Sequence, residues 1–262
     1  VLNPVALNGP ILTIRRFPDK PITMEDLISF GSVTEKVSEW LSKLVQAKYN
    51  IFISGGTGSG KTTFLNALSN FIPPQERIIT IEDSAELQIR SIPNLVRMET
   101  RNANVEGCQE ITIRDLIKTS LRMRPDRIIV GEVRGGEAFD MMQCLNTGHD
   151  GSMSTGHANS SADMLSRLEN MILMGMEIPL DAIRQQIASG IDIIVHLGRL
   201  RDRSRKVLEI VEVLGYEKGK IQLQTLYQFT EMGEDAQGKI QGELVKKGEL
   251  VYVEKLRSAG LC

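Results

Sequence analysis

A glycine-rich segment in the first quarter of the chain has the residue types and spacing of a phosphate-binding loop. Residues 55–62 read Gly-Gly-Thr-Gly-Ser-Gly-Lys-Thr, which satisfies the pattern G-x-x-x-x-G-K-[ST]. The pattern follows a β-rich run and precedes a helix-length segment, which is the context that this chemistry requires. Glycines let successive backbone N–H groups turn toward phosphate oxygens, and the N-terminus of the helix adds positive potential. The segment is therefore predicted to bind the phosphates of a nucleotide.

The side chains in and after this loop are predicted to hold ATP and Mg²⁺. Lys61 would reach the β- and γ-phosphates, and the Thr62 hydroxyl would ligate Mg²⁺. An ordinary glycine-rich turn is the alternative, but the pattern arises by chance in only about one such chain in a hundred. The residues predicted to contact the nucleotide are Gly56, Thr57, Gly58, Ser59, Gly60, Lys61, Thr62 and Thr63.

Acidic side chains follow two further β-rich runs, at the strand ends where open α/β sheets bind ligands. Glu82, Asp83 and Glu86 lie within five residues after one run, and Glu132 follows the next. A carboxylate there can orient the water that attacks the γ-phosphate, or can hold Mg²⁺ through water. Glu82 and Glu132 are predicted to lie beside the metal together with Thr62. A solvated acidic turn is the alternative for the first group.

Two cationic or titratable side chains follow at the same predicted sheet edge. Arg134 could neutralise phosphate charge or pair with a neighbouring acid. His157 comes after a fourth β-rich run and is expected to sense the γ-phosphate, although a lone histidine is more often structural. His149 and His196 are interpreted as structural.

These residues are positioned by an alternation of short β-rich runs with amphipathic segments between residues 50 and 197. Such alternation is typical of βαβ units and a mostly parallel sheet. The predicted strands cover residues 51–54, 77–81, 127–130, 152–155 and 192–196. The predicted helices cover residues 32–48, 61–71, 113–123, 137–147, 162–174 and 180–189.

The two ends of the chain have a different character. Residues 1–31 are rich in proline and predict a strand followed by a linker, and Ser32 with Glu35 is typical of a capping box for the next helix. Five basic residues within 199–206 predict a solvated hairpin tip rather than a contact with acidic lipid or a partner. The last segments are predicted as a hairpin of 206–214 and 220–229, a loop at 231–242, and a strand at 249–254.

Composition limits the classes of protein to which the chain can belong. Of its 262 residues, 41% are hydrophobic and 24% charged, which excludes wholesale disorder. The net charge of −2 excludes a global basic field, so no direct nucleic-acid binding is expected. The three cysteines form no close-spaced pair, which suits a reducing compartment. No apolar run can span a bilayer, no signal peptide is found, and the initial Val1 leads us to expect a longer protein.

Four segments resemble, in order, the motifs of the secretion ATPase superfamily. They are residues 55–63, Ile81–Glu86, Met123–Arg134 and Gly151–Asn159. That superfamily includes the hexameric motors of type II secretion, type IV pili and type IV secretion. Residues Arg134–Asp140 and Ile14–Phe17 look most similar to the CpaF-like branch, which powers tight-adherence pili. The resemblance covers about residues 10–215.

The resemblance also implies roles for single residues. Glu86 matches the glutamate that activates water, Glu132 matches the acid of the Walker B strand, and His157 matches the histidine of the His box. Arg15 and Arg16 resemble arginines that an N-terminal domain places around the nucleotide, often across a subunit boundary. Arg134 is a further candidate for catalysis, and Arg101 and Arg114 are weaker ones.

Together these features predict an α/β fold with a RecA-like P-loop core and a mostly parallel sheet. The core is predicted at 32–200, after the end of an N-terminal domain and linker at 1–31 and before a β-rich appendage at 201–262. The implied function is Mg²⁺-dependent ATP hydrolysis that powers assembly of a tight-adherence pilus or secretion of proteins across the envelope.

The implied partners are further copies of the chain, as a hexamer of the full-length protein, and an inner-membrane platform protein. The predicted location is cytoplasmic, at the inner face of the cell membrane. Two alternatives stay open, namely a conjugative DNA-transfer ATPase and a nucleotide-gated assembly scaffold with little turnover.

Overall fold

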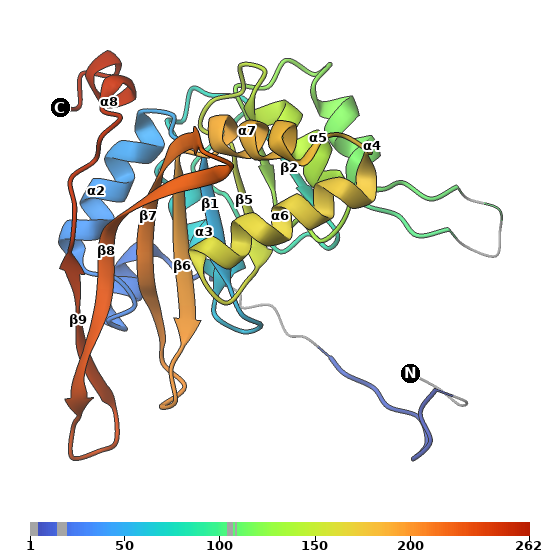
Figure 1. Cartoon of the computed structure of the whole chain (residues 1–262). Helices are drawn as coiled ribbons and strands as arrows, with labels where there is room; N and C mark the ends of the chain where they lie inside the picture. Colours follow the sequence, from blue (N-terminus) through green and yellow to red (C-terminus); the bar gives the residue numbers. More distant parts are fainter. Residues whose placement is uncertain (1–4, 15–19, 104–106, 108) are drawn as a thin grey trace.

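A nine-stranded sheet forms the centre of the protein (Figure 1). The computed structural model describes residues 5–14, 20–103, 107 and 109–262. The strand order is β3-β2-β4-β5-β1-β6-β7-β8-β9, parallel from β3 to β6 and antiparallel from β6 to β9. The strands are β1 Ile51–Gly55, β2 Ile78–Glu82, β3 Leu95–Glu99, β4 Arg127–Val130, β5 Met153–His157, β6 Ile193–Arg199, β7 Arg205–Glu217, β8 Lys220–Glu234 and β9 Ile240–Lys246.

Helices cover both faces of the parallel part of this sheet (Figure 1). Helices α1 to α3 share one hydrophobic core and α4 to α7 share the other. Alternate residues of β1 enter the two cores, with Ile51 and Ile53 in the first and Phe52 in the second, because strand side chains alternate. The helices are α1 Met24–Ser29, α2 Glu35–Gln46, α3 Lys61–Ser69, α4 Ile113–Ser120, α5 Glu137–Leu145, α6 Ser161–Gly175, α7 Leu180–Gly190 and α8 Glu254–Ser258.

The structure confirms the predicted α/β fold with its mostly parallel, doubly wound core. The five predicted strands are β1, β2, β4, β5 and β6, and the six predicted helices are α2 to α7. Strand β3 was missed because it lies at the edge of the sheet, where its side chains are at most half-buried. Within the described residues, no helix combines the length and apolarity needed to cross a bilayer.

The segment before the core differs from the prediction. Residues Met24–Ser29 form helix α1 inside the predicted linker. The predicted capping box at Ser32 is wrong, because the next helix begins at Glu35 and its N-cap is Thr34. The Thr34 hydroxyl accepts a hydrogen bond from the Val37 backbone N–H at 3.4 Å, which leaves Ser32 outside the helix.

The C-terminal part contains the predicted hairpin, formed by β7 and β8. The predicted loop at 231–242 is wrong, because β8 continues to Glu234 and β9 begins at Ile240. The predicted strand at 249–254 is also wrong. The backbone N–H groups of Val251 and Tyr252 donate to the Glu212 carboxylate instead of to a strand. Strands β7 to β9 extend the core sheet, so the proposed domain boundary at 200/201 falls within the turn between β6 and β7.

Candidate active site

The carboxyl ends of four neighbouring parallel strands meet the glycine-rich loop at one cleft. Strands β2, β4, β5 and β1 lie side by side in this order, so the side chains that follow them converge. The cleft has a volume of about 820 Å³. The predicted site residues that line it are Thr57, Gly58, Ser59, Gly60, Lys61, Thr62, Thr63, Glu82, Glu86, Glu132, Arg134 and His157.

The glycine-rich loop has the backbone geometry of an anion cradle. Gly58 and Gly60 have φ angles of 72° and 96°, in the left-handed region that favours glycine. Gly60 is the N-cap of α3 and has no side chain to close the helix end. The Ser59 hydroxyl is buried, with no hydrogen-bond partner among the residues that the structure describes. The N-terminus of α3 therefore presents its N–H groups to the cleft, which fits a bound phosphate group.

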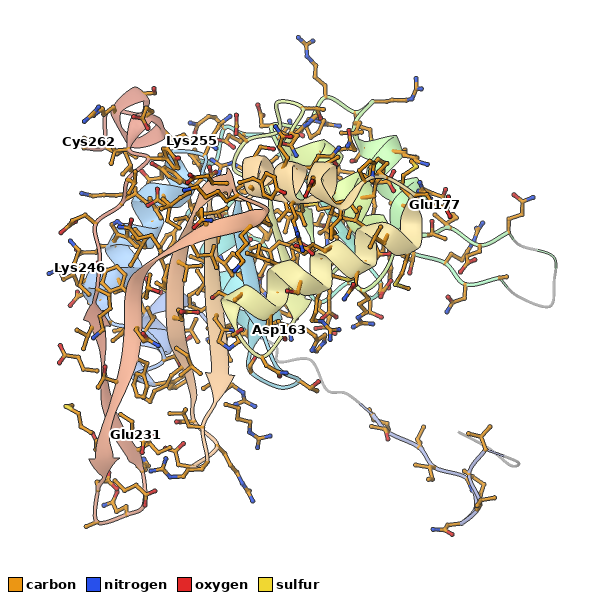
Figure 2. The ribbon with its side chains drawn as sticks, viewed as in Figure 1. Asp163, Glu177, Glu231, Lys246, Lys255 and Cys262 are labelled. Carbon is orange, nitrogen blue, oxygen red and sulfur yellow. The ribbon has the colours of Figure 1, made fainter. Side chains whose placement is uncertain are left out.

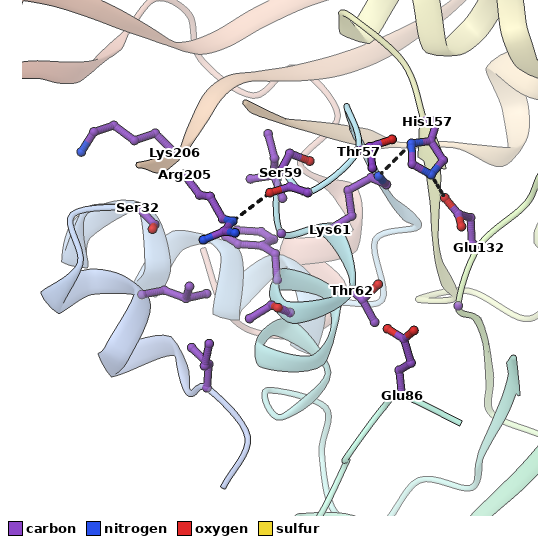
Figure 3. A pocket seen from close by; sticks show the side chains of 18 of the residues that line it. Ser32, Thr57, Ser59, Lys61, Thr62, Glu86, Glu132, His157, Arg205 and Lys206 are labelled. Atoms are coloured by element: carbon purple, nitrogen blue, oxygen red, sulfur yellow. Dashed lines mark hydrogen bonds and ion pairs between the residues drawn. The ribbon is translucent and has the colours of Figure 1, made fainter. Parts of the chain in front are cut away.

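Four side chains, from the start of α3, the end of β5 and the segment after β4, form a continuous polar network beside the loop (Figure 3). The Lys61 Nζ lies 3.1 Å from the Gly56 carbonyl oxygen and 3.3 Å from Nδ1 of His157. The His157 Nε2 lies 2.7 Å from one carboxylate oxygen of Glu132. The Nε of Arg134 donates to the other oxygen of Glu132 at 2.6 Å. The structure thus brings together four of the residues that the sequence singled out from separate motifs.

Burial changes the pKa values of Lys61 and His157 in this polar network. Burial lowers the pKa of Lys61, and Arg134 adds to this effect while Glu132 opposes it. Burial also lowers the pKa of His157, as do the charges of Lys61 and Arg134, although the Glu132 carboxylate opposes them. The Lys61 ammonium can only donate, so it makes His157 Nδ1 an acceptor, which leaves the ring proton on Nε2, beside the Glu132 carboxylate. The imidazole is thus a neutral link between the loop and β4.

Glu82 and Glu86, at the end of β2 and just after it, have different roles. One oxygen of the buried Glu82 carboxylate accepts the backbone N–H groups of Glu86 and Leu87, each at 2.8 Å. Burial raises the pKa of Glu82, against the effect of these hydrogen bonds. Glu86 itself lines the cleft and points toward Thr62 (Figure 3). Glu82 therefore shapes the segment that holds Glu86.

The oxygen donors in the cleft fit a magnesium ion bound together with phosphate. The Thr62 hydroxyl and the carboxylates of Glu86 and Glu132 are ligands of the kind that Mg²⁺ takes. In the described part of the chain, no cluster of three or more His, Cys, Asp or Glu residues could hold a metal ion by itself. An ion here would take its remaining ligands from phosphate oxygens and water.

Several residues of the cleft were not expected from the sequence. Ile22, Leu27 and Phe30 form an apolar wall, and Arg205 and Lys206 belong to the basic segment predicted as a solvated tip. That segment is a hairpin tip, as predicted, yet it faces the cleft. Its five basic residues in eight positions were the available signal.

The predicted arginines have different outcomes. Arg134 is in the cleft, and it pairs with neighbouring acids, which was one of the two predicted alternatives. Arg101 and Arg114 are not among the described residues that line the cleft, and Arg114 pairs with Asp140. Arg15 and Arg16 lie outside the described residues.

Comparison with known proteins identifies the family. Residues 2–243 match the family described as type II/IV secretion system protein. A candidate conjugal transfer protein of Mycobacterium tuberculosis is 39% identical over 227 residues, which cover 87% of this chain and 64% of that protein. The conjugal transfer protein TrbB of Rhizobium radiobacter is 34% identical over 233 residues, which cover 88% of this chain and 68% of that protein.

A solved structure supports the same relation. The crystal structure of the VirB11 ATPase from the Brucella suis type IV secretion system, in complex with sulphate, superposes with a TM-score of 0.62. It is 31% identical, and the match covers 76% of this chain and 60% of that one. This chain spans less than two thirds of the VirB11 chain and of the mycobacterial protein. The match along residues 2–243 nonetheless includes the glycine-rich loop and every strand that builds the cleft. The chain belongs to the type II/IV secretion system protein family.

Proposed function

We propose that this chain hydrolyses ATP in the cleft at the end of β1, β2, β4 and β5. The observation that supports this is the convergence of the glycine-rich loop, Lys61, Glu86 and the His157–Glu132 pair on one cavity. The cavity, at about 820 Å³, is large enough for a nucleoside triphosphate. Phosphoryl transfer depends mainly on placing charges and the attacking water, and this is what the cleft provides.

Different residues of the cleft would bind the phosphates, orient the attacking water and hold Mg²⁺. The amides of the loop and Lys61 bind the phosphates and stabilise the charge that spreads over the γ-phosphoryl oxygens. Glu86 orients the attacking water, because its carboxylate faces the cleft beside Thr62. Thr62 and Glu132 would hold Mg²⁺, which supplies charge neutralisation at the β- and γ-phosphates when bound. Glu82 supports Glu86 by fixing its backbone.

The chemistry of Glu132 depends on its partners. Its carboxylate already pairs with His157 and accepts from Arg134, so it has little freedom to move toward a ligand by itself. A phosphate that approaches Lys61 competes for the contact between Lys61 and His157. We propose that His157 senses the γ-phosphate through this competition and that Arg134 moves from Glu132 toward phosphate charge.

At the scale of the assembly, we propose a ring-shaped motor that does work at the inner face of the cell membrane. The partners would be further copies of the chain, as a hexamer of the full-length protein, and an inner-membrane platform protein. Arg15 and Arg16 would approach the nucleotide from the N-terminal side, in part across the subunit boundary. These proposals rest on the family to which the chain belongs.

Two kinds of machine fit such a motor. The motif of Arg134–Asp140 supports a tight-adherence pilus or a related protein secretion system. The conjugal transfer relatives, at 39% and 34% identity, favour DNA transfer as a second candidate. A strain that lacks the protein would separate them, because the first predicts loss of surface pili or secreted protein and the second predicts loss of plasmid transfer.

The test of hydrolysis is a steady-state ATPase assay on an oligomeric preparation of the whole protein. Glu86→Gln removes the base but keeps the size of the side chain, so kcat is expected to fall about 10²- to 10⁴-fold with ATP binding retained. Lys61→Ala should weaken ATP binding as well. Glu177→Gln is the matched control, since Glu177 is exposed and does not line the cleft.

One outcome would reject the motor. If the wild-type protein turns over ATP no faster than Glu86→Gln and Lys61→Ala while still binding it, the nucleotide-gated scaffold becomes the better description. Loss of ATP binding in the wild type would reject both descriptions.

A further inference from the structure

The turn between β6 and β7 is an unusually well-anchored surface segment. Leu200 and Ser204 pair across it, since the Leu200 N–H donates to the Ser204 carbonyl oxygen at 2.9 Å. The Asp202 carboxylate accepts from the backbone N–H and the hydroxyl of Ser204, and from the Ile240 N–H of β9. These hydrogen bonds lower the pKa of Asp202 to about 2. Hydrogen bonds therefore close the turn and join it to β9, the strand at this edge of the sheet.

Contacts on both flanks fix the direction of the turn. The guanidinium of Arg201 pairs with Glu231 and Glu234 on β8. On the other flank, the Lys206 Nζ donates to the Gly31 carbonyl oxygen at 2.9 Å. The Val207 N–H donates to the Ser32 carbonyl oxygen, also at 2.9 Å. The turn thus bridges the long hairpin and the segment between α1 and α2.

Arg205 extends from this rigid turn onto the glycine-rich loop (Figure 3). Its Nε donates to the Gly58 carbonyl oxygen at 2.8 Å. Its aliphatic stem lies close to Gly60, where an added Cβ would be 3.4 Å from the Arg205 Cδ. A guanidinium has five N–H donors, and this contact uses one. In the described residues, the other donors of Arg205 have no hydrogen-bond partner within the protein.

The position of Arg205 is that of a second cation at the phosphate site. Lys61 stands at the start of α3 and contacts His157 of β5, while Arg205 approaches the loop from β7 on the exposed side. Arginine binds phosphate bidentately, and a side chain held in advance by its surroundings loses less entropy on binding. Among the described residues, Arg205 forms no ion pair, and the nearby acids Glu231 and Glu234 pair with Arg201 instead.

We propose that Arg205 binds a phosphate group of the nucleotide, so that the turn between β6 and β7 is part of the nucleotide site. This inference rests on the proposed function, since it assumes that the cleft holds a nucleoside triphosphate. Arg205 keeps its contact with Gly58 and directs its remaining N–H groups to phosphate oxygens. A phosphate group bound by Arg205 is then connected, through Lys206 and Val207, to the segment at Gly31 and Ser32.

The experiment measures ATP binding at equilibrium, without hydrolysis, for three variants. Arg205→Gln can still donate to Gly58 but has no charge, and Arg205→Lys keeps the charge without the planar fork. The control, Arg199→Gln, removes one charge near the same turn from an exposed side chain that does not line the cleft. We expect a Kd for ATP about tenfold higher in Arg205→Gln, partial recovery in Arg205→Lys and no change in the control.

Ionic strength provides the second readout. A lost charge contact predicts that the difference between wild type and Arg205→Gln shrinks as salt is raised, whereas a distorted loop predicts a constant difference. Equal ATP affinity of wild type and Arg205→Gln, or a loss that Arg205→Lys repeats in full at every salt concentration, would overturn the proposal. Both results leave the proposed function intact. Absence of ATP binding in the wild type would instead reject the proposed function.

Discussion

At the scale of single residues, the His157 imidazole connects two parts of the site that differ in charge. Lys61 approaches Nδ1 at 3.3 Å, and one oxygen of the Glu132 carboxylate lies 2.7 Å from Nε2. Protonation of Nδ1 would place two positive charges against each other, so the neutral ring is the form that fits these contacts. Burial, together with the charge of Lys61, lowers the pKa of His157 below its ordinary value of 6.5, although Glu132 opposes this.

This arrangement predicts a pH dependence of stability in the nucleotide-free protein. Because the folded pKa of His157 lies below the unfolded one, its contribution is complete above pH 6.5 and is lost as the pH falls through the folded pKa. Thermal unfolding of the wild type and of His157→Gln should therefore differ most near pH 7 to 8, and the curves should converge in acid. A difference that widens toward acid would contradict the neutral ring.

At the scale of elements, the positions of α5 and α6 depend on a close approach of two glycines. A Cβ added at Gly175, at the end of α6, would lie 2.5 Å from the carbonyl oxygen of Gly136, the N-cap of α5. Both partners are backbone, so neither can move away as a flexible side chain would. Helix α5 begins shortly after Glu132 and Arg134, so this crossing positions the segment that carries them.

Gly175→Ala is therefore expected to destabilise the protein, by about 1–3 kcal/mol, because the extra methyl overpacks a backbone contact. Urea unfolding monitored by circular dichroism measures the change. Asn170→Ala, at an exposed position of the same helix, is the control and should change the free energy of unfolding by less than about 0.5 kcal/mol. A similar small change for both variants would show that the helices separate easily.

At the scale of the whole molecule, the C-terminal segment returns to the core and closes the end of the sheet opposite the long β8–β9 hairpin. Figure 2 shows Lys255 at that end and Glu231 near the hairpin. The Lys255 Nζ pairs with Asp192 at 2.7 Å and with Asp150 at 2.9 Å. Burial raises the pKa of Asp192, against the effect of Lys255. The segment thereby supplies a cation to two carboxylates of the core, of which Asp192 also accepts the Asn50 N–H at 2.7 Å.

The buried carboxylate of Glu212 carries part of this closure. It accepts the N–H groups of Val251 and Tyr252, each at 2.8 Å. Glu212→Gln replaces one acceptor by a donor, which leaves a backbone N–H unsatisfied, and we expect a loss of about 1–3 kcal/mol in the free energy of unfolding. Glu217→Gln, exposed on the same strand, is the control. If chemical denaturation gives the same free energy of unfolding for the wild type and both variants, the contacts of Glu212 with the C-terminal segment add no stability.

How much of this protein could be predicted depends on how far apart in sequence the interacting residues lie. The phosphate loop, its strand and its helix are one continuous segment, so the residue types from Gly55 to Thr62 predicted it from local rules alone. Alternation of strands and helices predicted the sheet, and parallel strand ends predicted that Glu86, Glu132 and His157 would meet. The local period of the sequence also predicted α2 to α7, although not their ends.

Tertiary structure alone decided which groups pair within the cleft. The contact of Arg205 with Gly58 joins residues 147 positions apart, and no local pattern encodes such a distance. Packing between elements likewise decides that His157 and Arg134 contact different oxygens of Glu132. Strand register decides that β9, which begins within a predicted loop, pairs with β8. Short-range rules fix the backbone conformation of a segment, whereas partners across the fold are fixed only when all the segments pack together.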